Sequence, residues 1–470
     1  MTGQITISIW IFLLLIAITI LAILDRVLIP STRWLLRRRV NRVIDEISKR
    51  LDIEIKPFQL TKRRVLIDRL IYDPKVIEAI QIKAQEHDIP RELVQAKVMR
   101  YAKEIVPSFN AYLYFRIGYW LAKKIANLLY HVHIGLEDNE QFADIDPDST
   151  VVFVMNHRSN MDYILVAFLA AEKTTLSYAV GEWAKVWPLQ ALIRSMGAFF
   201  VRRKSGNPLY RLVLERYIHM ATKEGVCQAV FLEGGLSRDG LLRPPKLGFI
   251  DYMLRSFKPG NDRDIIFIPV GINYDRTLED RSLLRMLNPD AQKRSRWFIM
   301  KTTIRFIWRS IIFILLTRWQ RFGYASVNFG QRISAREYCR LNDIDFSKMK
   351  RKDRFLEVEK ISGHIMASIQ NVIPVLPVPL VASVFVKFPG DLLSAFDVEA
   401  HTNRIIDEIQ VTNAPVFLST TSRVQNIVTA LNMLRIRRLV IERDGLYKAD
   451  PEMLNVLSYY ANSIDHYFPH

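Results

Sequence analysis

Polar residues interrupt a strongly apolar stretch of the chain, VVFVMNHRSNMDYILVAFLA, between Val151 and Ala170. The interruption, NHRSNMD, contains His157 and, five positions later, Asp162. An imidazole can act as a general base near neutral pH, and a neighbouring carboxylate fixes its tautomer and stabilises the imidazolium. Five residues of an α-helix turn through about 500°, so the two side chains can meet only if His157 precedes the first turn. We therefore predict an acid–base pair at a junction between a buried strand and a helix.

Asp162 also has a purely structural interpretation. The residues from Ser159 to Asp162 match a capping box, in which Ser159 caps the helix and Asp162 is its third residue. A lone histidine is also more often structural than catalytic. The density of polar neighbours around His157, in a segment that is otherwise apolar, favours the catalytic interpretation.

Three more polar clusters follow apolar segments that read as strands. GAFFVRRKSG places two arginines at a strand end, where a solvated loop is the alternative, and FLEGGLSRDGLLRPPKLGF places an acid and two glycines there. The fourth, IIFIPVGINYDR, reads as a buried strand that ends in polar residues. Paired glycines allow a tight turn close to a ligand, and the donors near them suit a phosphate. The residues that we expect at the substrate are Arg158, Ser159, Arg202, Arg203, Glu233, Gly234, Gly235, Ser237, Arg238 and Lys246.

The elements that must position these clusters form an α/β pattern. From about residue 150, short segments that are apolar throughout alternate with helical segments, which predicts a mostly parallel central sheet covered by helices on both faces. Polar residues at the ends of such strands face the edge where α/β proteins bind ligands. Residues from about 34 to 135 read as mostly helical, with one break at Ile89–Pro90.

The composition of the chain indicates an anionic partner and a reducing compartment. The 470 residues carry a formal net charge of +18, which calls for an anionic partner. Nucleic acid is disfavoured, because the chain has neither a zinc-finger spacing nor a basic recognition helix. The two cysteines, Cys227 and Cys339, lack metal-like spacing and indicate a reducing compartment without disulfides.

The N-terminus predicts a membrane anchor. Ile5 to Leu24 is an uncharged apolar run, and about 20 such residues cross a bilayer as a helix. A cleaved signal peptide is the alternative, but the basic n-region and the small-residue cleavage site are missing. Arg26 and the arginines after it place the rest of the chain in the cytosol by the positive-inside rule.

A second apolar segment, RWFIMKTTIRFIWRSIIFILLTRWQRFG, does not read as a span. Lys301, Arg305 and Arg309 recur every four residues and form a basic stripe on one helical face. An arginine in mid-bilayer costs roughly 2.5 kcal/mol or more, whereas a basic amphipathic helix lies readily in the interface. We expect such an interfacial helix on anionic lipid, with packing against the protein's own sheet as the alternative.

The four clusters, in this order, resemble the glycerolipid acyltransferase family. NHRSNMD is similar to its His-x4-Asp motif, and GAFFVRR, FLEGGLSRDG and IPVGINYDR are similar to its second, third and fourth blocks. The segments EGGLSRDGLLRPPKLG and YASVNFGQRISAREY resemble the branch that acylates glycerol 3-phosphate or dihydroxyacetone phosphate. The resemblance covers roughly residues 70 to 385. Together with the apolar run and the helical pattern described above, it divides the chain into an anchor over 1–30, a helical region over 31–135, an acyltransferase domain over 136–345 and a C-terminal extension over 346–470.

The resemblance also implies a reaction. His157 would be the general base, Asp162 would orient it, and backbone N–H groups near the start of the following helix would meet the oxyanion. The acceptor would be glycerol 3-phosphate and the donor acyl-CoA or acyl carrier protein, with no metal and no cofactor. The enzyme would work at the cytosolic face of a membrane, which we expect to be the bacterial inner membrane.

One departure from the family leaves the acceptor open. The branch usually has an arginine, implicated in holding the acceptor phosphate, where this chain has Leu236. Lysophosphatidic acid and dihydroxyacetone phosphate therefore stay as alternative acceptors. A non-catalytic membrane protein that binds anionic lipid is the alternative from another class, but it leaves the His157–Asp162 pair without a role.

Overall fold

The structure, a computed structural model, describes Ile9 and residues 56–135, 145–170, 174–181, 189–202, 205–287, 321–419 and 422–468. The predicted anchor, apart from Ile9, lies outside the described residues, and so do Arg203 and the basic stripe at 301–309. Among the helices that are described, none combines the length and the apolar composition that crossing a bilayer requires.

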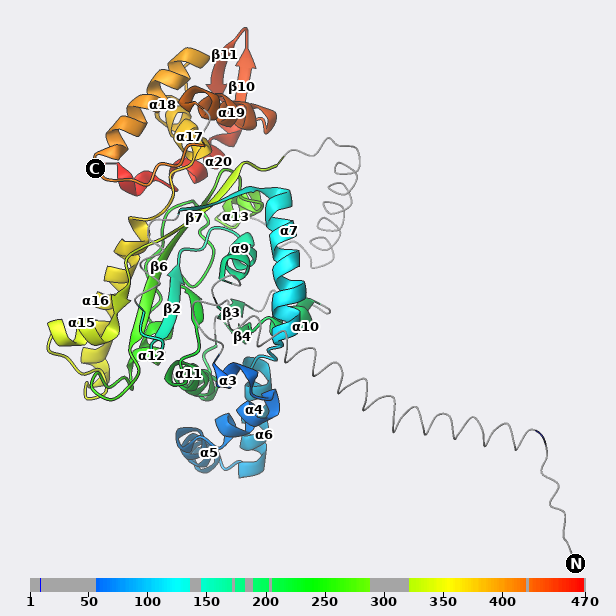
Figure 1. Ribbon diagram of the computed structural model, residues 1–470, viewed down its shortest axis with the longest axis vertical. Helices are drawn as coiled ribbons and strands as arrows, with labels where there is room; N and C mark the ends of the chain where they lie inside the picture. Colours follow the sequence, from blue (N-terminus) through cyan, green and yellow to red (C-terminus); the bar gives the residue numbers. More distant parts are fainter. Residues whose placement is uncertain are drawn as a thin grey trace, which may run out of the picture.

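A mixed sheet forms the centre of the molecule (Figure 1). Its strands, in spatial order, are β1 (His131–Gly135), β7 (Tyr324–Phe329), β6 (Ile265–Tyr274), β2 (Thr150–Met155), β5 (Gln228–Phe231), β3 (Ser177–Gly181) and β4 (Phe199–Val201), with β8 (Ile333–Ser334) beside β6. The block from β6 to β4 is parallel, whereas β7 and β8 pair antiparallel with β6. The prediction of a mostly parallel sheet is confirmed, and the carboxyl ends of the parallel block share one edge.

Helices cover both faces of this sheet. Alternate residues of β2 point to opposite faces, as in any strand, and all of them are buried. Val152 and Val154 belong to the hydrophobic cluster under α11 (Pro208–Lys223), α12 (Gly248–Leu254) and α16 (Arg351–Gln370). The intervening residues of β2 belong to the cluster under α7 (Tyr119–Leu129) and α9 (Met161–Ala170). Burial on both faces explains why β2 and β6 are apolar along most of their length.

The predicted helical lead-in lies at one end of the sheet (Figure 1). It consists of α3 (Pro57–Leu60), α4 (Arg63–Ile71), α5 (Pro74–Glu86) and α6 (Arg91–Ile105), followed by the π-helix η2 (Leu113–Gly118) and α7. The predicted break falls between α5 and α6, as Ile89–Pro90 indicates. The end of the region differs from the prediction, because residues 131–135 form β1, which extends the sheet by pairing with β7.

The C-terminal region caps the opposite end of the sheet with a third hydrophobic cluster (Figure 1). Its elements are α17 (Pro377–Lys387), β9 (Leu393–Ser394), α18 (Ala395–Gln410), α19 (Arg423–Ile436), β10 (Val440–Arg443), β11 (Leu446–Ala449) and α20 (Leu454–Ala461), with short 3₁₀ turns at Pro451–Met453 and Asp465–Tyr467. The short strands form a three-stranded antiparallel sheet. Three further short helices, α10 (Leu189–Ser195), α13 (Asp280–Arg285) and α15 (Ala335–Leu341), connect elements of the central sheet.

A buried carboxylate fastens α12 to its neighbours. Asp251 accepts hydrogen bonds from Arg255, the C-cap residue of α12, and from Arg354 of α16, whose Nε lies 2.9 Å away. Arg255 also pairs with Glu215 of α11. The network therefore connects three helices on one face of the sheet.

Replacing Asp251 by alanine should destabilise the protein, because Arg255 and Arg354, which are largely buried, would lose their carboxylate partner. Removing one member of such a pair costs about 3 kcal/mol, and thermal unfolding of the purified protein measures the loss. Asp353→Ala is the matched control, since Asp353 is exposed on α16 and should change stability by less than about 0.5 kcal/mol. Equal melting temperatures for the two variants would contradict this role of Asp251.

Candidate active site

His157 and Asp162 meet at the carboxyl end of β2. His157 Nδ1 lies 2.8 Å from Asp162 Oδ2, and both side chains are buried. Helix α9 begins at Met161, so His157 precedes the first turn and folds back over it. The structure thus has the arrangement that the five-residue spacing requires.

Asp162 receives four hydrogen bonds. Besides His157 Nδ1, its Oδ2 accepts from the backbone N–H groups of Arg158 and Ser159, at 2.8 and 3.1 Å. Its Oδ1 accepts from the Tyr274 hydroxyl of β6 at 2.6 Å. Burial raises the pKa of the Tyr274 phenol well above its ordinary value, and the charge of Asp162 adds to the shift, so the hydroxyl stays protonated and donates.

Half of the predicted capping box is present. Asp162 accepts from the N–H of Ser159, as the motif requires. The Ser159 hydroxyl, however, accepts from the N–H of Met161 rather than from that of Asp162. Asp162 therefore caps the helix start and contacts His157 with the same oxygen, so the structural and the catalytic interpretations of this residue do not exclude each other.

The imidazole of His157 is fixed from several sides. Its ring stacks on Phe231 of β5 at 3.9 Å between centroids, and Tyr163 of α9 packs edge-on at 5.4 Å. An ionised carboxylate only accepts hydrogen bonds, so Nδ1 must carry the proton that it shares with Asp162. Nε2 is then the basic nitrogen, and it is buried without a hydrogen-bond partner among the described residues. A hydroxyl that reached Nε2 could give up its proton there.

Glu279 holds the turn between His157 and α9. Its Oε2 accepts from the Ser159 hydroxyl at 2.7 Å, and its Oε1 accepts from the side-chain amide of Asn160 at 3.0 Å. Burial raises the pKa of Glu279, and the hydrogen bonds from Ser159 and Asn160 oppose that shift. Glu279 thereby fixes the residues that position Asp162.

The predicted source of oxyanion donors is wrong for the residues nearest to His157. The N–H groups of residues 158 and 159 donate to Asp162, and that of Asn160 donates to Glu279. The N–H groups of residues 161 and 162 donate to the side chain and the carbonyl of Ser159. These N–H groups already donate hydrogen bonds within the turn, so the oxyanion of the reaction would need donors from another segment.

The glycine loop after β5 packs beneath this turn. Glu233 accepts from the backbone N–H of His157 at 2.8 Å and from that of Arg243 at 3.0 Å, and burial raises its pKa. Ser237 is buried, and its N–H donates to the carbonyl of His157 at 2.9 Å. Gly234 has a φ of +67°, and a Cβ there would lie 2.8 Å from Lys246 Cγ, so this position requires glycine.

Arg158 is buried, with 2% of its surface exposed. Its guanidinium donates to the carbonyls of Gly240 and Ser463, the second at 3.3 Å, and its own carbonyl accepts from the Tyr459 hydroxyl. The C-terminal region therefore contacts the residue next to His157. This environment fits a structural position better than contact with a substrate phosphate.

The other predicted phosphate ligands divide into two groups. Arg202 forms a two-point ion pair with Glu104 of α6, with nitrogen–oxygen distances of 2.6 and 3.0 Å. Arg238 and Lys246, in contrast, are exposed on the loop that follows Gly235. Leu236 packs against the hydrophobic cluster of the C-terminal region. Of the predicted cations that the structure describes, Arg238 and Lys246 are the best placed to meet a solvent-borne anion.

The sequence did not indicate that Tyr274, Glu279 and Glu104 contact predicted site residues, which are Asp162, Ser159 and Arg202, respectively. Tyr274 ends the strand IPVGINY, and Glu279 lies five residues beyond it, so the polar end of the fourth block was the available signal. Within the part of the chain that the structure describes, no group of three or more His, Cys, Asp and Glu side chains could hold a metal ion.

Two family models match the chain. Residues 133–273 match the model described as Acyltransferase, and residues 312–470 match the model described as Glycerol-3-phosphate acyltransferase C-terminal region.

Curated relatives are named glycerol-3-phosphate acyltransferase. The one from Ectopseudomonas mendocina (strain ymp) is 32% identical over 304 residues, which are 64% of this chain and 35% of that protein. The one from Pseudomonas putida (strain W619) is 34% identical over 283 residues, 58% of this chain and 32% of that protein. The chain thus matches about a third of the length of these relatives. Among solved structures, the 1-acyl-sn-glycerophosphate (LPA) acyltransferase from Thermotoga maritima is 16% identical, with a TM-score of 0.31, over 54% of this chain and 78% of that one.

The chain therefore contains, in this order, an acyltransferase region and a region that matches the C-terminal part of glycerol-3-phosphate acyltransferases, and it is 32% and 34% identical to relatives of that name over the aligned residues.

Proposed function

We propose that the protein transfers a fatty acyl group from an acyl thioester to the sn-1 hydroxyl of glycerol 3-phosphate, giving lysophosphatidic acid for phospholipid biosynthesis. The donor is acyl-CoA or acyl carrier protein. The enzyme works on the cytosolic face of a membrane, held by the N-terminal span that the sequence predicts. The observation that supports this most strongly is the buried His157–Asp162 pair, in which Nδ1 is engaged by the carboxylate and Nε2 is not engaged by a described residue.

The proposed reaction needs one general base and no covalent intermediate. Nε2 of His157 takes the proton from the acceptor hydroxyl as its oxygen attacks the thioester carbonyl. Asp162 stabilises the imidazolium that forms. The tetrahedral intermediate then collapses, the carbon–sulfur bond breaks, and the thiolate takes the proton back from the imidazolium. The products are an ester and a free thiol, and His157 returns to its starting tautomer.

The acceptor is proposed to bind through its phosphate at the loop that bears Arg238 and Lys246. Both cations are exposed there, and the loop is joined to the His157 turn by the Ser237–His157 backbone hydrogen bond. Lysophosphatidic acid and dihydroxyacetone phosphate also carry a phosphate near a hydroxyl, so they remain alternatives. Leu236, which packs on the C-terminal cluster, takes no part in phosphate binding in this proposal.

The direct test offers the detergent-purified full chain each of the three acceptors together with a long-chain acyl-CoA. We expect release of free CoA and formation of lysophosphatidic acid with glycerol 3-phosphate as the best acceptor. Faster turnover of either alternative would reassign the acceptor. Absence of thioester turnover with all three, and with acyl carrier protein as donor, would favour the non-catalytic lipid-binding protein.

His157→Ala should lower kcat by about 10²–10⁴, the usual contribution of a positioned general base. The acyl donor should still bind, since its affinity does not depend on proton transfer. Steady-state turnover and equilibrium binding of a non-hydrolysable acyl-CoA analogue measure the two effects. A variant that keeps more than half of wild-type turnover would remove His157 from the mechanism.

Asp162→Asn should reduce kcat about as strongly as His157→Ala, because the neutral amide cannot stabilise an imidazolium. The amide oxygen can still accept from the N–H groups of Arg158 and Ser159, so the weaker, uncharged cap should cost about 1 kcal/mol of stability or less. A thermal melt and an activity assay on the same sample report both effects. A lower melting temperature with undiminished turnover would leave Asp162 as a helix cap only.

Tyr274→Phe should move the acidic limb of the pH–rate profile to higher pH. Without the phenol, Asp162 Oδ1 loses a donor, its charge is felt more strongly by His157, and the imidazolium is stabilised further. Tyr130→Phe is the matched control, because that buried hydroxyl beside Tyr274 donates to the carbonyl of Arg276 instead. An acidic limb that moves in neither variant would contradict the role of Tyr274.

Arg238→Ala should chiefly impair use of the phosphorylated acceptor. A lost charged hydrogen bond is worth roughly 1.5–3 kcal/mol, or about 10- to 150-fold in kcat/KM for glycerol 3-phosphate. Arg404→Ala, which removes an exposed arginine from α18, should leave the acceptor kinetics unchanged. If Arg238→Ala raises the KM of the acyl donor instead, the loop belongs to the donor site.

A further inference from the structure

The π-helix η2 and helix α7 form one continuous helix from Leu113 to Leu129 at the margin of the molecule (Figure 1). The residues at their junction, Gly118 and Tyr119, have ordinary right-handed helical angles. One face of this helix packs on α9 through the small side chains of Ala122 and Ala126, which are buried with Phe168 in the second cluster. Helix α7 is therefore the direct neighbour of the helix that begins at the candidate active site.

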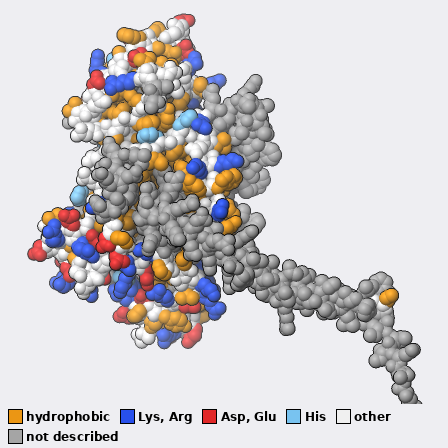
Figure 2. Space-filling model, viewed as in Figure 1, with side chains coloured by type: hydrophobic (Ala, Val, Ile, Leu, Met, Phe, Trp, Pro, Cys, Tyr) orange, Lys and Arg blue, Asp and Glu red, His pale blue; other side chains and the backbone are white. Residues whose placement is uncertain are grey.

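The opposite face is exposed, and it combines apolar and basic side chains. Trp120 is 56% exposed and Ile117 is 43% exposed. Arg116 and Lys124 lie on the same face, and the Lys124 ammonium sits 4.9 Å from the centre of the Trp120 ring. The space-filling view shows orange apolar and blue basic side chains together over α7 (Figure 2). An aromatic and aliphatic surface of this kind is costly to leave in water.

Acidic side chains are missing from this part of the chain. No aspartate or glutamate occurs between residues 105 and 135, although the chain has 48 of them in all. A surface for an ordinary protein partner would gain specificity from charges of both signs. Tryptophan beside lysine and arginine, with no acid, matches the composition of helices that lie at the surface of anionic bilayers.

We propose that the exposed face of η2–α7, formed by Arg116, Ile117, Trp120 and Lys124, lies against an anionic lipid bilayer. The residues of this surface differ from those of the predicted N-terminal anchor and of the basic stripe at 301–309. It sets the orientation of the catalytic domain, because α9 lies directly behind α7. The inference rests on the proposed function in one respect. The acyl chain of the donor and the lysophospholipid product both partition into a bilayer, so the site of the proposed reaction should face one.

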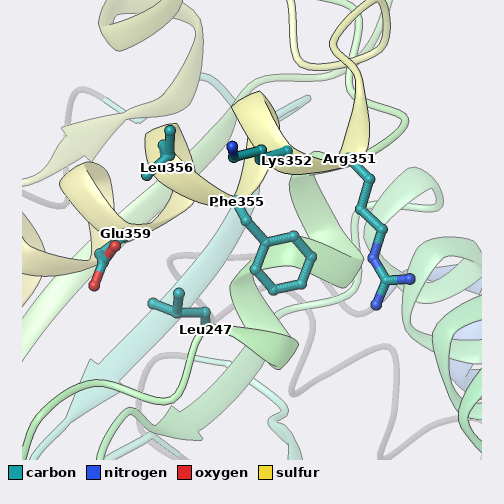
Figure 3. A pocket seen from close by; sticks show the side chains of 6 residues that line it. All are labelled: Leu247, Arg351, Lys352, Phe355, Leu356 and Glu359. Carbon is teal, nitrogen blue, oxygen red and sulfur yellow. The ribbon is translucent and has the colours of Figure 1, made fainter.

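A groove along α16 offers a useful contrast (Figure 3). It has a volume of about 530 Å³ and is lined by Leu247, Arg351, Lys352, Phe355, Leu356 and Glu359. It too combines aromatic, aliphatic and basic side chains. Asp353, Glu357 and Glu359 are interspersed among them, however, so an anionic membrane would be repelled as well as attracted. The groove therefore provides control positions for the test.

The test places a fluorescent label at Trp120 in the full chain. The native cysteines, Cys227 and Cys339, are buried, so Trp120→Cys can be labelled selectively with an environment-sensitive fluorophore. The labelled protein is reconstituted into phosphatidylcholine vesicles with or without phosphatidylglycerol, containing lipids with a quencher near the headgroup. Leu341→Cys, on an exposed residue of α15, is the matched control label.

We expect quenching and a blue-shifted emission at position 120 but not at 341, stronger with phosphatidylglycerol and weaker in high salt. Adding Arg116→Glu and Lys124→Glu to the labelled variant should reduce quenching at least several-fold. Adding Arg351→Glu and Lys352→Glu instead should leave it unchanged. Equal quenching at 120 and 341, or quenching that ignores phosphatidylglycerol and both charge reversals, would overturn the proposal.

Two further outcomes separate this inference from others. A blue shift at position 120 in lipid-free detergent that grows with protein concentration would indicate a second copy of the chain on this face, and would also overturn the proposal. The quenching signal needs no turnover, so the two proposals fail separately. Quenching without thioester turnover would refute the proposed function and leave the bilayer surface standing, whereas turnover without quenching would do the reverse.

Discussion

The carboxylate of Asp162 is the interaction on which the site depends. A buried carboxylate is stable only when its oxygens are satisfied, and here four donors converge on them. Two of these donors are backbone N–H groups that fix the start of α9, a third is Tyr274 of β6, and the fourth is His157. The burial of one charge thus determines where the helix begins, how it meets the neighbouring strand, and which nitrogen of the imidazole is basic.

The C-terminal region also stabilises this arrangement, because it contacts Arg158 and the glycine loop. Arg158 reaches the carbonyl of Ser463, and a Cβ at Gly240 would overlap the carbonyl oxygen of Tyr459, so the glycine loop and α20 lie in direct contact. Asp280, one residue after Glu279, accepts from both Arg437 and Tyr460. The segments on either side of the candidate site, at Arg158 and at Asp280, are therefore both held by residues of the C-terminal matched region.

The sequence predicts those features that local patterns determine. The apolar run before Asn156 is short and rich in β-branched residues, which favours a strand buried on both faces, and the His157–Asp162 spacing permits contact only if His157 precedes the first helical turn. The break at Ile89–Pro90 follows from proline stereochemistry in the same way. These predictions hold because each depends on residues that are neighbours along the chain.

Partners that are distant in sequence could not be predicted. Tyr274 lies 112 positions from Asp162, and Glu104 lies 98 positions from Arg202, so no local pattern pairs them. An arginine in a loop reads as a candidate phosphate ligand until its counter-ion is known. For this reason Arg158 and Arg202, predicted at the substrate, are found on carbonyls and on a glutamate, whereas Arg238 keeps an exposed position that suits the prediction.

Asp162 is proposed to hold His157 in the tautomer whose Nε2 can accept a proton. The most direct measurement is the nitrogen NMR spectrum of the full chain labelled with ¹⁵N-histidine, in which the His157 signals are assigned by their loss in His157→Gln. In the resting neutral imidazole, we expect Nδ1 to carry the proton and Nε2 to show the chemical shift of an unprotonated ring nitrogen. A His157 ring that carries its proton on Nε2, with Nδ1 bare, would contradict the account, because the proposed base would then have no free electron pair facing the acceptor.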